Sequence, residues 1–177
     1  MKIEKIETGY LEENCYVLSI EDKCLLIDPG DEFDKIKNLI GNKKVLACLI
    51  THYHFDHVGA LEEVKEFYCC PVIDYNSNKI QEVGPFKFEI IYTPGHKEDA
   101  VTYYFKDDKV MFVGDFIFKG TIGRCDLSGG DFNKMMESLK LIKKYDSNIT
   151  LYPGHGKETT LKDELENNPY LRGEIHE

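Results

Sequence analysis

The chain lacks a long apolar segment and an excess of positive charge. No apolar run among its 177 residues reaches the ~18 residues of a membrane-spanning helix. Its first residues alternate charged and apolar side chains, so they lack the continuous apolar core of a signal peptide. Acidic residues outnumber basic ones by 32 to 22, which disfavours nucleic acid or an anionic membrane as partner. We therefore expect a cytoplasmic protein that acts on a small molecule.

A cysteine framework is also missing. The six cysteines form no Cys-x-x-Cys pair, and Cys69 and Cys70 are adjacent. This spacing indicates neither a zinc finger nor a redox motif and predicts buried free thiols in a reducing compartment. No low-complexity tract, linker or short-period repeat divides the chain. A single domain over residues 1–177 is therefore expected, long enough to bury roughly 70% of its unfolded surface.

The order of the predicted elements indicates an α/β (α+β) protein. Strands are predicted at 2–8, 14–20, 23–28, 45–50, 71–74, 86–92, 101–105, 110–113 and 148–152. Helices are predicted at 36–40, 58–67, 131–145 and 160–166, with irregular segments at 75–84 and 116–130. Groups of antiparallel-looking strands interrupted by helices fit a four-layer αββα sandwich, in which helices flank two mixed β-sheets.

The most informative stretch lies between a predicted buried strand and the helix at 58–67. It reads Thr-His-Tyr-His-Phe-Asp-His, and four of its residues are metal-ligand types: His52, His54, Asp56 and His57. His52 and His54 are two residues apart, so in an extended segment their side chains point the same way. Asp56 stands where the helix begins, a position that the helix dipole favours for a carboxylate.

Three more ligand-type residues follow predicted strands. His96 and His155 are each the last residue of a Pro-Gly-His tripeptide, and Asp115 follows Val-Gly. His176, near the C-terminus, is expected to be solvated and has no assigned role. Loops at one edge of a sandwich can converge, which would bring together five imidazoles and two carboxylates. Seven ligands exceed the four of one zinc ion, so we predict two metal ions that share a bridging group. Mixed imidazole and carboxylate ligation suits zinc, iron or manganese, and zinc is placed first.

These motifs resemble those of the metallo-β-lactamase superfamily of hydrolases. Residues 51–57 are similar to its His-x-His-x-Asp-His motif, and His96, Asp115 and His155 match its remaining metal positions in order and spacing. The words at 93–96, 114–118, 120–124 and 152–156 look like those of glyoxalase II (hydroxyacylglutathione hydrolase) and its short bacterial relatives. The resemblance covers nearly the whole chain and implies the metallo-β-lactamase fold.

The resemblance also implies a role for each residue. The implied ligands of the first metal are His52, His54 and His96, and those of the second are Asp56, His57 and His155. Asp115 would bridge the two metals, and Asp28, at the end of its strand, would orient a ligand from behind. Asp56 is also the predicted catalytic residue, placed to orient hydroxide or carry a proton. Lys97, Phe116 and Arg124 are the expected substrate contacts.

The predicted reaction is hydrolysis by a hydroxide that two metal ions share. Two ions roughly 3.5–4 Å apart lower the pKa of bound water toward ~7. A thiolate leaves readily because its parent thiol has a pKa near ~8.5, whereas an amide nitrogen needs an acid that these motifs do not supply. A thioester is therefore the predicted substrate.

The chain departs from full-length glyoxalase II in two places. It ends 22 residues after His155, so the C-terminal helical domain that binds glutathione is expected to be absent, and glutathione recognition stays open. Lys97 stands where that family has a small hydroxyl residue; it would contact an anionic substrate or be solvated. Asp115 also replaces the cysteine of many zinc β-lactamases, which disfavours antibiotic hydrolysis.

Three alternatives remain open at this point. The first is persulfide oxidation by one iron held by the first-site histidines and the aspartate. The second is a phosphodiesterase or nuclease on the same fold, which the acidic balance disfavours. The third is a non-catalytic metal-binding module. The sequence does not define the oligomeric state.

Overall fold

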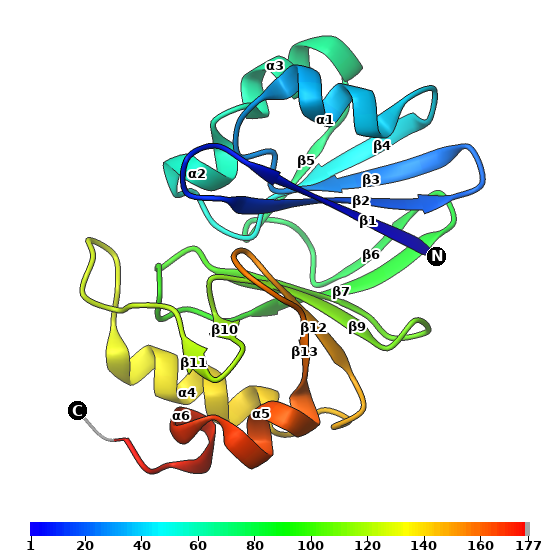
Figure 1. The fold of residues 1–177 in the computed structure, drawn as a ribbon. Coiled ribbons are helices and arrows are strands. Elements are labelled where there is room, and N and C mark those ends of the chain that lie inside the picture. Colours follow the sequence, from blue (N-terminus) through cyan, green and yellow to red (C-terminus); the bar gives the residue numbers. More distant parts are fainter. Residues whose placement is uncertain (176–177) are drawn as a thin grey trace.

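The computed structural model describes residues 1–175 and contains two β-sheets stacked face to face, with helices on both outer sides (Figure 1). The predicted four-layer αββα sandwich is therefore confirmed. His176 lies outside the described residues. Among the residues that are described, no helix is both long and apolar enough to cross a bilayer.

The first sheet has the strand order β1-β2-β3-β4-β5. Its strands are β1 (Lys2–Thr8), β2 (Glu13–Ile20), β3 (Lys23–Ile27), β4 (Lys44–Leu49) and β5 (Val72–Ile73). The pairs β1–β2 and β2–β3 are antiparallel, whereas β3–β4 and β4–β5 are parallel. The helices on its outer face are α1 (Phe33–Ile40) and α3 (Leu61–Tyr68).

The second sheet has the strand order β13-β12-β9-β8-β7-β6. Its strands are β6 (Ile80–Val83), β7 (Phe86–Tyr92), β8 (Val101–Phe105), β9 (Val110–Gly114), β12 (Thr150–Pro153) and β13 (Thr159–Thr160). Only β9 and β12 run parallel; the other pairs are antiparallel. The helices on its outer face are α4 (Phe132–Ile142), α5 (Leu161–Asn167) and α6 (Pro169–Arg172). A separate hairpin consists of β10 (Ile117–Phe118) and β11 (Thr121–Ile122).

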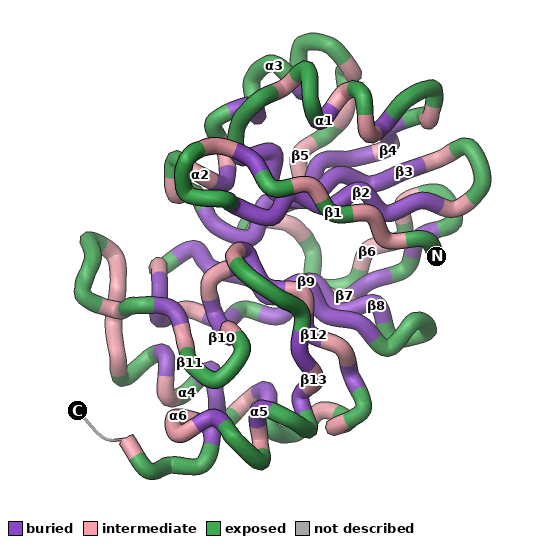
Figure 2. The backbone as a smooth tube through the Cα atoms, in the orientation of Figure 1, coloured by how far each residue is buried: buried purple, intermediate pink, exposed green. Residues whose placement is uncertain are grey.

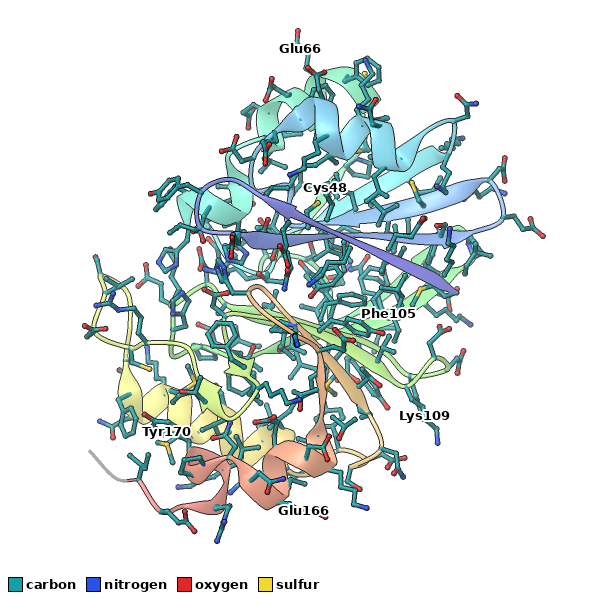
Figure 3. All side chains as sticks on the ribbon, in the orientation of Figure 1. Cys48, Glu66, Phe105, Lys109, Glu166 and Tyr170 are labelled. Atoms are coloured by element: carbon teal, nitrogen blue, oxygen red, sulfur yellow. The ribbon has the colours of Figure 1, made fainter. Side chains whose placement is uncertain are left out.

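The core has three layers because the central strands are buried on both faces (Figure 2). In β2, Tyr16 and Leu18 face the other sheet, while Cys15 and Val17 face α1 and α3. This alternation follows from the two-residue period of a strand. Phe105 of β8 fills the space between the sheets (Figure 3). The continuous apolar runs of the sequence thus mark strands that are covered on both sides.

Several element boundaries differ from the predictions. The helix predicted at 58–67 begins only at Leu61, in α3, and a separate short helix, α2 (Phe55–Val58), precedes it. The two helices are separate because the backbone N–H of Ala60 donates to the Pro29 carbonyl. The segment 75–84 contains β6, and 116–130 contains β10 and β11. Asn168 does end α5, but it also caps α6 by accepting from the Tyr170 N–H. Tertiary hydrogen bonds, which local patterns do not encode, decide these boundaries.

All six cysteines are free thiols, as predicted. The prediction that they are buried is right for Cys15, Cys24 and Cys48 and wrong for the others. Cys69 is exposed, and Cys70 and Cys125 are half-buried. The buried three lie on strands β2, β3 and β4, where the sheet is covered on both faces.

Candidate metal centre

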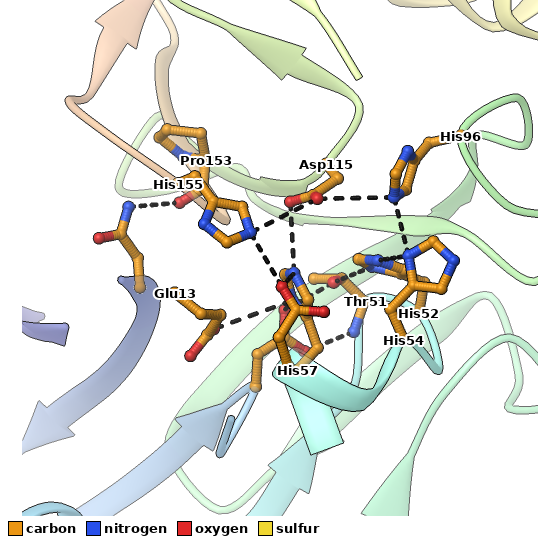
Figure 4. Close-up of polar contacts among 12 residues, drawn as sticks. Glu13, Thr51, His52, His54, His57, His96, Asp115, Pro153 and His155 are labelled. Atoms are coloured by element: carbon orange, nitrogen blue, oxygen red, sulfur yellow. Dashed lines mark hydrogen bonds and ion pairs between the residues drawn. The ribbon is translucent and has the colours of Figure 1, made fainter. Parts of the chain in front are cut away.

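The predicted metal ligands lie together at one edge of the sandwich (Figure 4). They follow the C-terminal ends of strands from both sheets. The loop after β4 leads to residues 52–57, β7 leads to His96, β9 leads to Asp115 and β12 leads to His155. Loops after strand ends are where α/β proteins place functional side chains. The structure thus brings together seven side chains that are up to 103 positions apart, from 52 to 155.

The first group consists of His52, His54 and His96. Nδ1 of His54 lies 3.0 Å from Nε2 of His52 and 2.9 Å from Nε2 of His96. One ring nitrogen from each residue therefore faces a common point. Neutral imidazole nitrogens at such a point form a ligand set for one divalent ion.

The second group consists of Asp56, His57 and His155. Oδ2 of Asp56 lies 3.1 Å from Nε2 of His155 and 3.7 Å from Nε2 of His57. In each of the two groups, all ligand atoms lie within 4.8 Å of one another. The two groups fall on opposite sides of Asp115.

Asp115 connects the two groups. Its Oδ1 lies 3.3 Å from Nε2 of His57. Its Oδ2 lies 3.5 Å from Nε2 of His96 and 3.6 Å from Nε2 of His155. One carboxylate thus faces a residue of the first group and two residues of the second.

Hydrogen bonds behind the rings set which nitrogen of each histidine faces the centre. Nδ1 of His52 donates to Thr51 Oγ1 (3.1 Å), and Nδ1 of His57 donates to Asp28 Oδ2 (2.9 Å). For the other two rings, the acceptors of Nδ1 are the backbone carbonyls of Arg124 for His96 (2.8 Å) and Leu11 for His155 (3.1 Å). When such a ring is neutral, the proton held on Nδ1 leaves Nε2 with a lone pair that faces inward. Four rings are therefore oriented before any ligand binds.

Asp28 is the centre of this support. Besides His57, it accepts hydrogen bonds from the Thr51 backbone N–H (2.8 Å) and the Thr51 hydroxyl (2.6 Å). Its backbone has a φ of 50°, in the left-handed region that aspartate and asparagine tolerate better than most residues. Asp28 thus acts on His57 directly and on His52 through Thr51.

The electrostatics favour the protonation states that bind metal at two positions. Burial, with the nearby His57, lowers the pKa of His52 well below its usual range. Burial would raise the pKa of Asp115, but the imidazole of His57, whose Nε2 lies 3.3 Å from Asp115 Oδ1, lowers it overall. Burial alone would lower the pKa of His57, but Asp28 and Asp115 raise it well above its usual value. A metal ion at His57 therefore has to displace a proton.

The buried polar atoms show that this centre fits metal ions. Nε2 of His57 and Oδ1 of Asp115 are buried and have no hydrogen-bond partner among residues 1–175. Buried polar groups are otherwise almost always satisfied. A divalent cation would satisfy both atoms, and the imidazole and carboxylate donor set matches zinc, iron or manganese.

Packing around residue 154 explains the glycine of the second Pro-Gly-His motif. A Cβ on Gly154 would collide with Oδ1 of Asp115 and would lie 2.6 Å from Cε1 of His57. Only glycine leaves room for both side chains beside the β12 end. The glycine that precedes His155 thus keeps two other ligand residues in place.

Sequence reasoning did not identify Glu13 as part of this site. Its carboxyl group is fully buried, accepts from the Thr8 hydroxyl (2.9 Å) and has Oε1 3.8 Å from Nδ1 of His57. Burial raises its pKa well above the usual value. The available signal was a glutamate at the start of the mostly apolar strand β2, because a buried carboxyl group needs a specific environment.

A cavity of about 680 Å³ opens beside the metal ligands. Of the three predicted substrate contacts, Arg124 lines it. Phe116 does not, because its ring is buried in the core between the second sheet and α4; Phe118 lines the cavity instead. Lys97 does not line it either, and its Nζ pairs with Asp99 (3.1 Å).

This fold and centre define a class: αββα proteins with a two-group histidine and aspartate site at the sheet edge. A family model described as "Metallo-beta-lactamase superfamily" matches residues 8–73 and 71–155. The chain belongs to the metallo-β-lactamase superfamily, a family of metal-dependent hydrolases.

Two curated relatives align over nearly their whole length. "Probable metallo-hydrolase YqgX" of Bacillus subtilis is 35% identical, with 98% of this chain and 99% of the relative covered. "Hydroxyacylglutathione hydrolase GloC" of Haemophilus influenzae is 29% identical, with 97% and 98% covered.

Solved structures show the same architecture. A structure described as BLEG-1 B3 metallo-beta-lactamase superposes with a TM-score of 0.92 at 28% identity, covering 96% of this chain and 99% of the other. TTHA1623 in a di-iron-bound form superposes with a TM-score of 0.87 at 31% identity, covering 95% and 100%. The names of these relatives state different activities and metals, so membership of the superfamily alone does not define the substrate.

Proposed function

We propose that this protein hydrolyses thioesters with two divalent metal ions at the described centre. The observation that carries the proposal is the pair of ligand groups on either side of Asp115, whose rings are already oriented from behind. Ions held there would supply Lewis-acid polarisation of a carbonyl group and a water molecule of lowered pKa. We place zinc first; the di-iron form of TTHA1623 makes iron the next choice.

Asp56 is the proposed catalytic residue. Its carboxylate lines the cavity, and its Oδ2 lies 3.1 Å from Nε2 of His155. Burial would raise its pKa, but the hydrogen bond with His155 and the charge of His57 lower it. The ionised carboxylate can orient a water molecule and accept its proton within hydrogen-bond reach.

The cavity favours a leaving group that departs as an anion. Apart from the ligand residues, the described residues that line it supply no carboxyl or imidazole group that could protonate an amine. A thiolate needs little protonation because the parent thiol has a pKa near ~8.5. The name of GloC, a relative that aligns end to end, supports the same reaction class.

A thioester panel that includes S-lactoylglutathione tests the proposal when it is measured together with metal content. His54→Ala and Asp115→Ala should lose metal and turnover together, whereas Asp34→Asn, an exposed change in α1, should keep both. Full thioester turnover at unchanged metal content in either alanine variant would contradict the two-metal scheme. Iron content with oxygen consumption on a persulfide would instead identify a dioxygenase reaction at one iron ion.

A further inference from the structure

The cavity beside the metal centre has a polar floor and apolar walls. The floor consists of the ligand side chains His54, Asp56, His96, Asp115 and His155. The wall side chains come from four separate segments: Leu11, Phe55, Phe118, Ile122 and Leu127. An extended apolar surface that begins directly at the reacting centre is placed to contact the part of a substrate next to the bond that breaks.

Hydrogen bonds hold one of these walls in place. The β10–β11 hairpin carries Phe118 and Ile122. The turn of this hairpin is held by α5 and by the residue that follows α5. The buried Glu164 carboxylate accepts from the Gly120 N–H (2.9 Å), and the Asn168 amide donates to the Thr121 carbonyl (2.9 Å). The hairpin thus has anchors away from the cavity, so its apolar side chains form a preformed surface.

The other wall residues expose apolar side chains to water. Phe55 is 63% exposed and stacks on Tyr10, with ring centroids 6.4 Å apart and planes at 21°. Leu11 and Leu127, which also border the cavity, are 42% and 41% exposed. Single exposed apolar residues are normal, but several at one cavity mark a binding surface.

The same walls offer no free positive charge. Among the described residues that line the cavity, Arg124 is the sole arginine or lysine. Its Nε and Nη2 both donate to the Asp126 carboxylate at 2.7 Å. The chain as a whole carries a net charge of −10. A carboxylate placed against these walls would lose water without gaining a partner.

We propose that these walls select a thioester whose thiol part is neutral and apolar, in preference to an anionic peptide thiol such as glutathione. This inference rests on the proposed thioester hydrolysis. It assigns Leu11, Phe55, Phe118, Ile122 and Leu127 to substrate specificity. Apolar contacts of this size change kcat/KM by about 10–200-fold between substrates.

The test compares two lactoyl thioesters that differ only in the thiol: benzyl mercaptan and glutathione. The metal-loaded protein should show a kcat/KM at least about tenfold higher for the benzyl ester. Leu127→Lys should reduce this ratio about tenfold, because the new cation favours the glutathione carboxylates. Ile80→Lys is the matched control, since Ile80 is 65% exposed on β6 and does not line the cavity; its ratio should equal that of the unchanged protein.

Calorimetric binding of the two free thiols to the metal-loaded protein separates this inference from the proposed function. Both compounds bind through a thiol group, so the difference between their Kd values measures how the cavity walls interact with the rest of each molecule. If no thioester is hydrolysed, the proposed reaction is wrong, yet tighter binding of benzyl mercaptan would still support an apolar recognition surface. Equal or tighter binding of glutathione, or a Leu127→Lys variant with an unchanged ratio, would overturn the inference.

Discussion

Asp28→Asn changes one atom behind the metal centre and should weaken mainly the second metal site. Oδ2 of Asp28 accepts from both His57 Nδ1 and the Thr51 hydroxyl. If the asparagine oxygen keeps the Thr51 N–H, its amide group faces these two donors and cannot accept from either. His57 then loses the hydrogen bond that keeps its Nε2 lone pair inward. The φ of 50° at this position suits asparagine, so the backbone conformation should remain.

The expected loss follows from such supporting hydrogen bonds. Removing a partner behind a metal-bound histidine weakens metal binding about 10–100-fold, or about 1.4–2.7 kcal/mol. The site with His57 should lose this amount, and the site with His52 less, because it is linked to Asp28 only through Thr51. Competition with a chromogenic chelator resolves two binding steps, and Asp34→Asn serves as the control. Two unchanged Kd values in Asp28→Asn would refute the role given to this carboxylate.

Three further predictions concern packing, a thiol and the hairpin anchor. Gly154→Ala should lose the second metal and thioester turnover, because its methyl group displaces Asp115 and His57; an unchanged content of two metals would speak against this steric argument. Burial raises the pKa of Cys125 to about 11. Its labelling by iodoacetamide at pH 8, followed by peptide mass spectrometry, should therefore be about 100-fold slower than that of a thiol with a pKa of about 9. The labelling rate should rise about tenfold per pH unit up to about pH 10, and a rate independent of pH would contradict this prediction. Glu164→Gln replaces one acceptor oxygen of a buried carboxylate that binds Gly120, Thr159 and Asn168. The free energy of unfolding, measured by urea denaturation, should therefore fall by about 1–3 kcal/mol, and equal stability would contradict this cost.

Much of the architecture could be predicted because it depends on short-range patterns. The apolar run of β4 and the alternation in β7 predict strands, and stacked sheets follow from their order. The ligand cluster was visible since four of its members lie within six positions, from His52 to His57. These features need no knowledge of distant contacts.

The rest depends on contacts that the sequence pattern does not carry. The break between α2 and α3 arises because the Ala60 N–H binds Pro29, and β6 forms because it pairs with β7. Phe116 and Phe118 are two residues apart, and only the hairpin decides which of them reaches the cavity. Glu13 became visible only when the fold placed it beside His57.

A metal titration of the metal-free protein, followed by thioester hydrolysis at each step, tests the central claim most directly. The two ligand groups on either side of Asp115 predict no turnover without metal, and full kcat only after the second equivalent of zinc has bound. Elemental analysis of the same samples gives the number of ions per chain. Full turnover at one equivalent, or hydrolysis by the metal-free chain, would contradict the account.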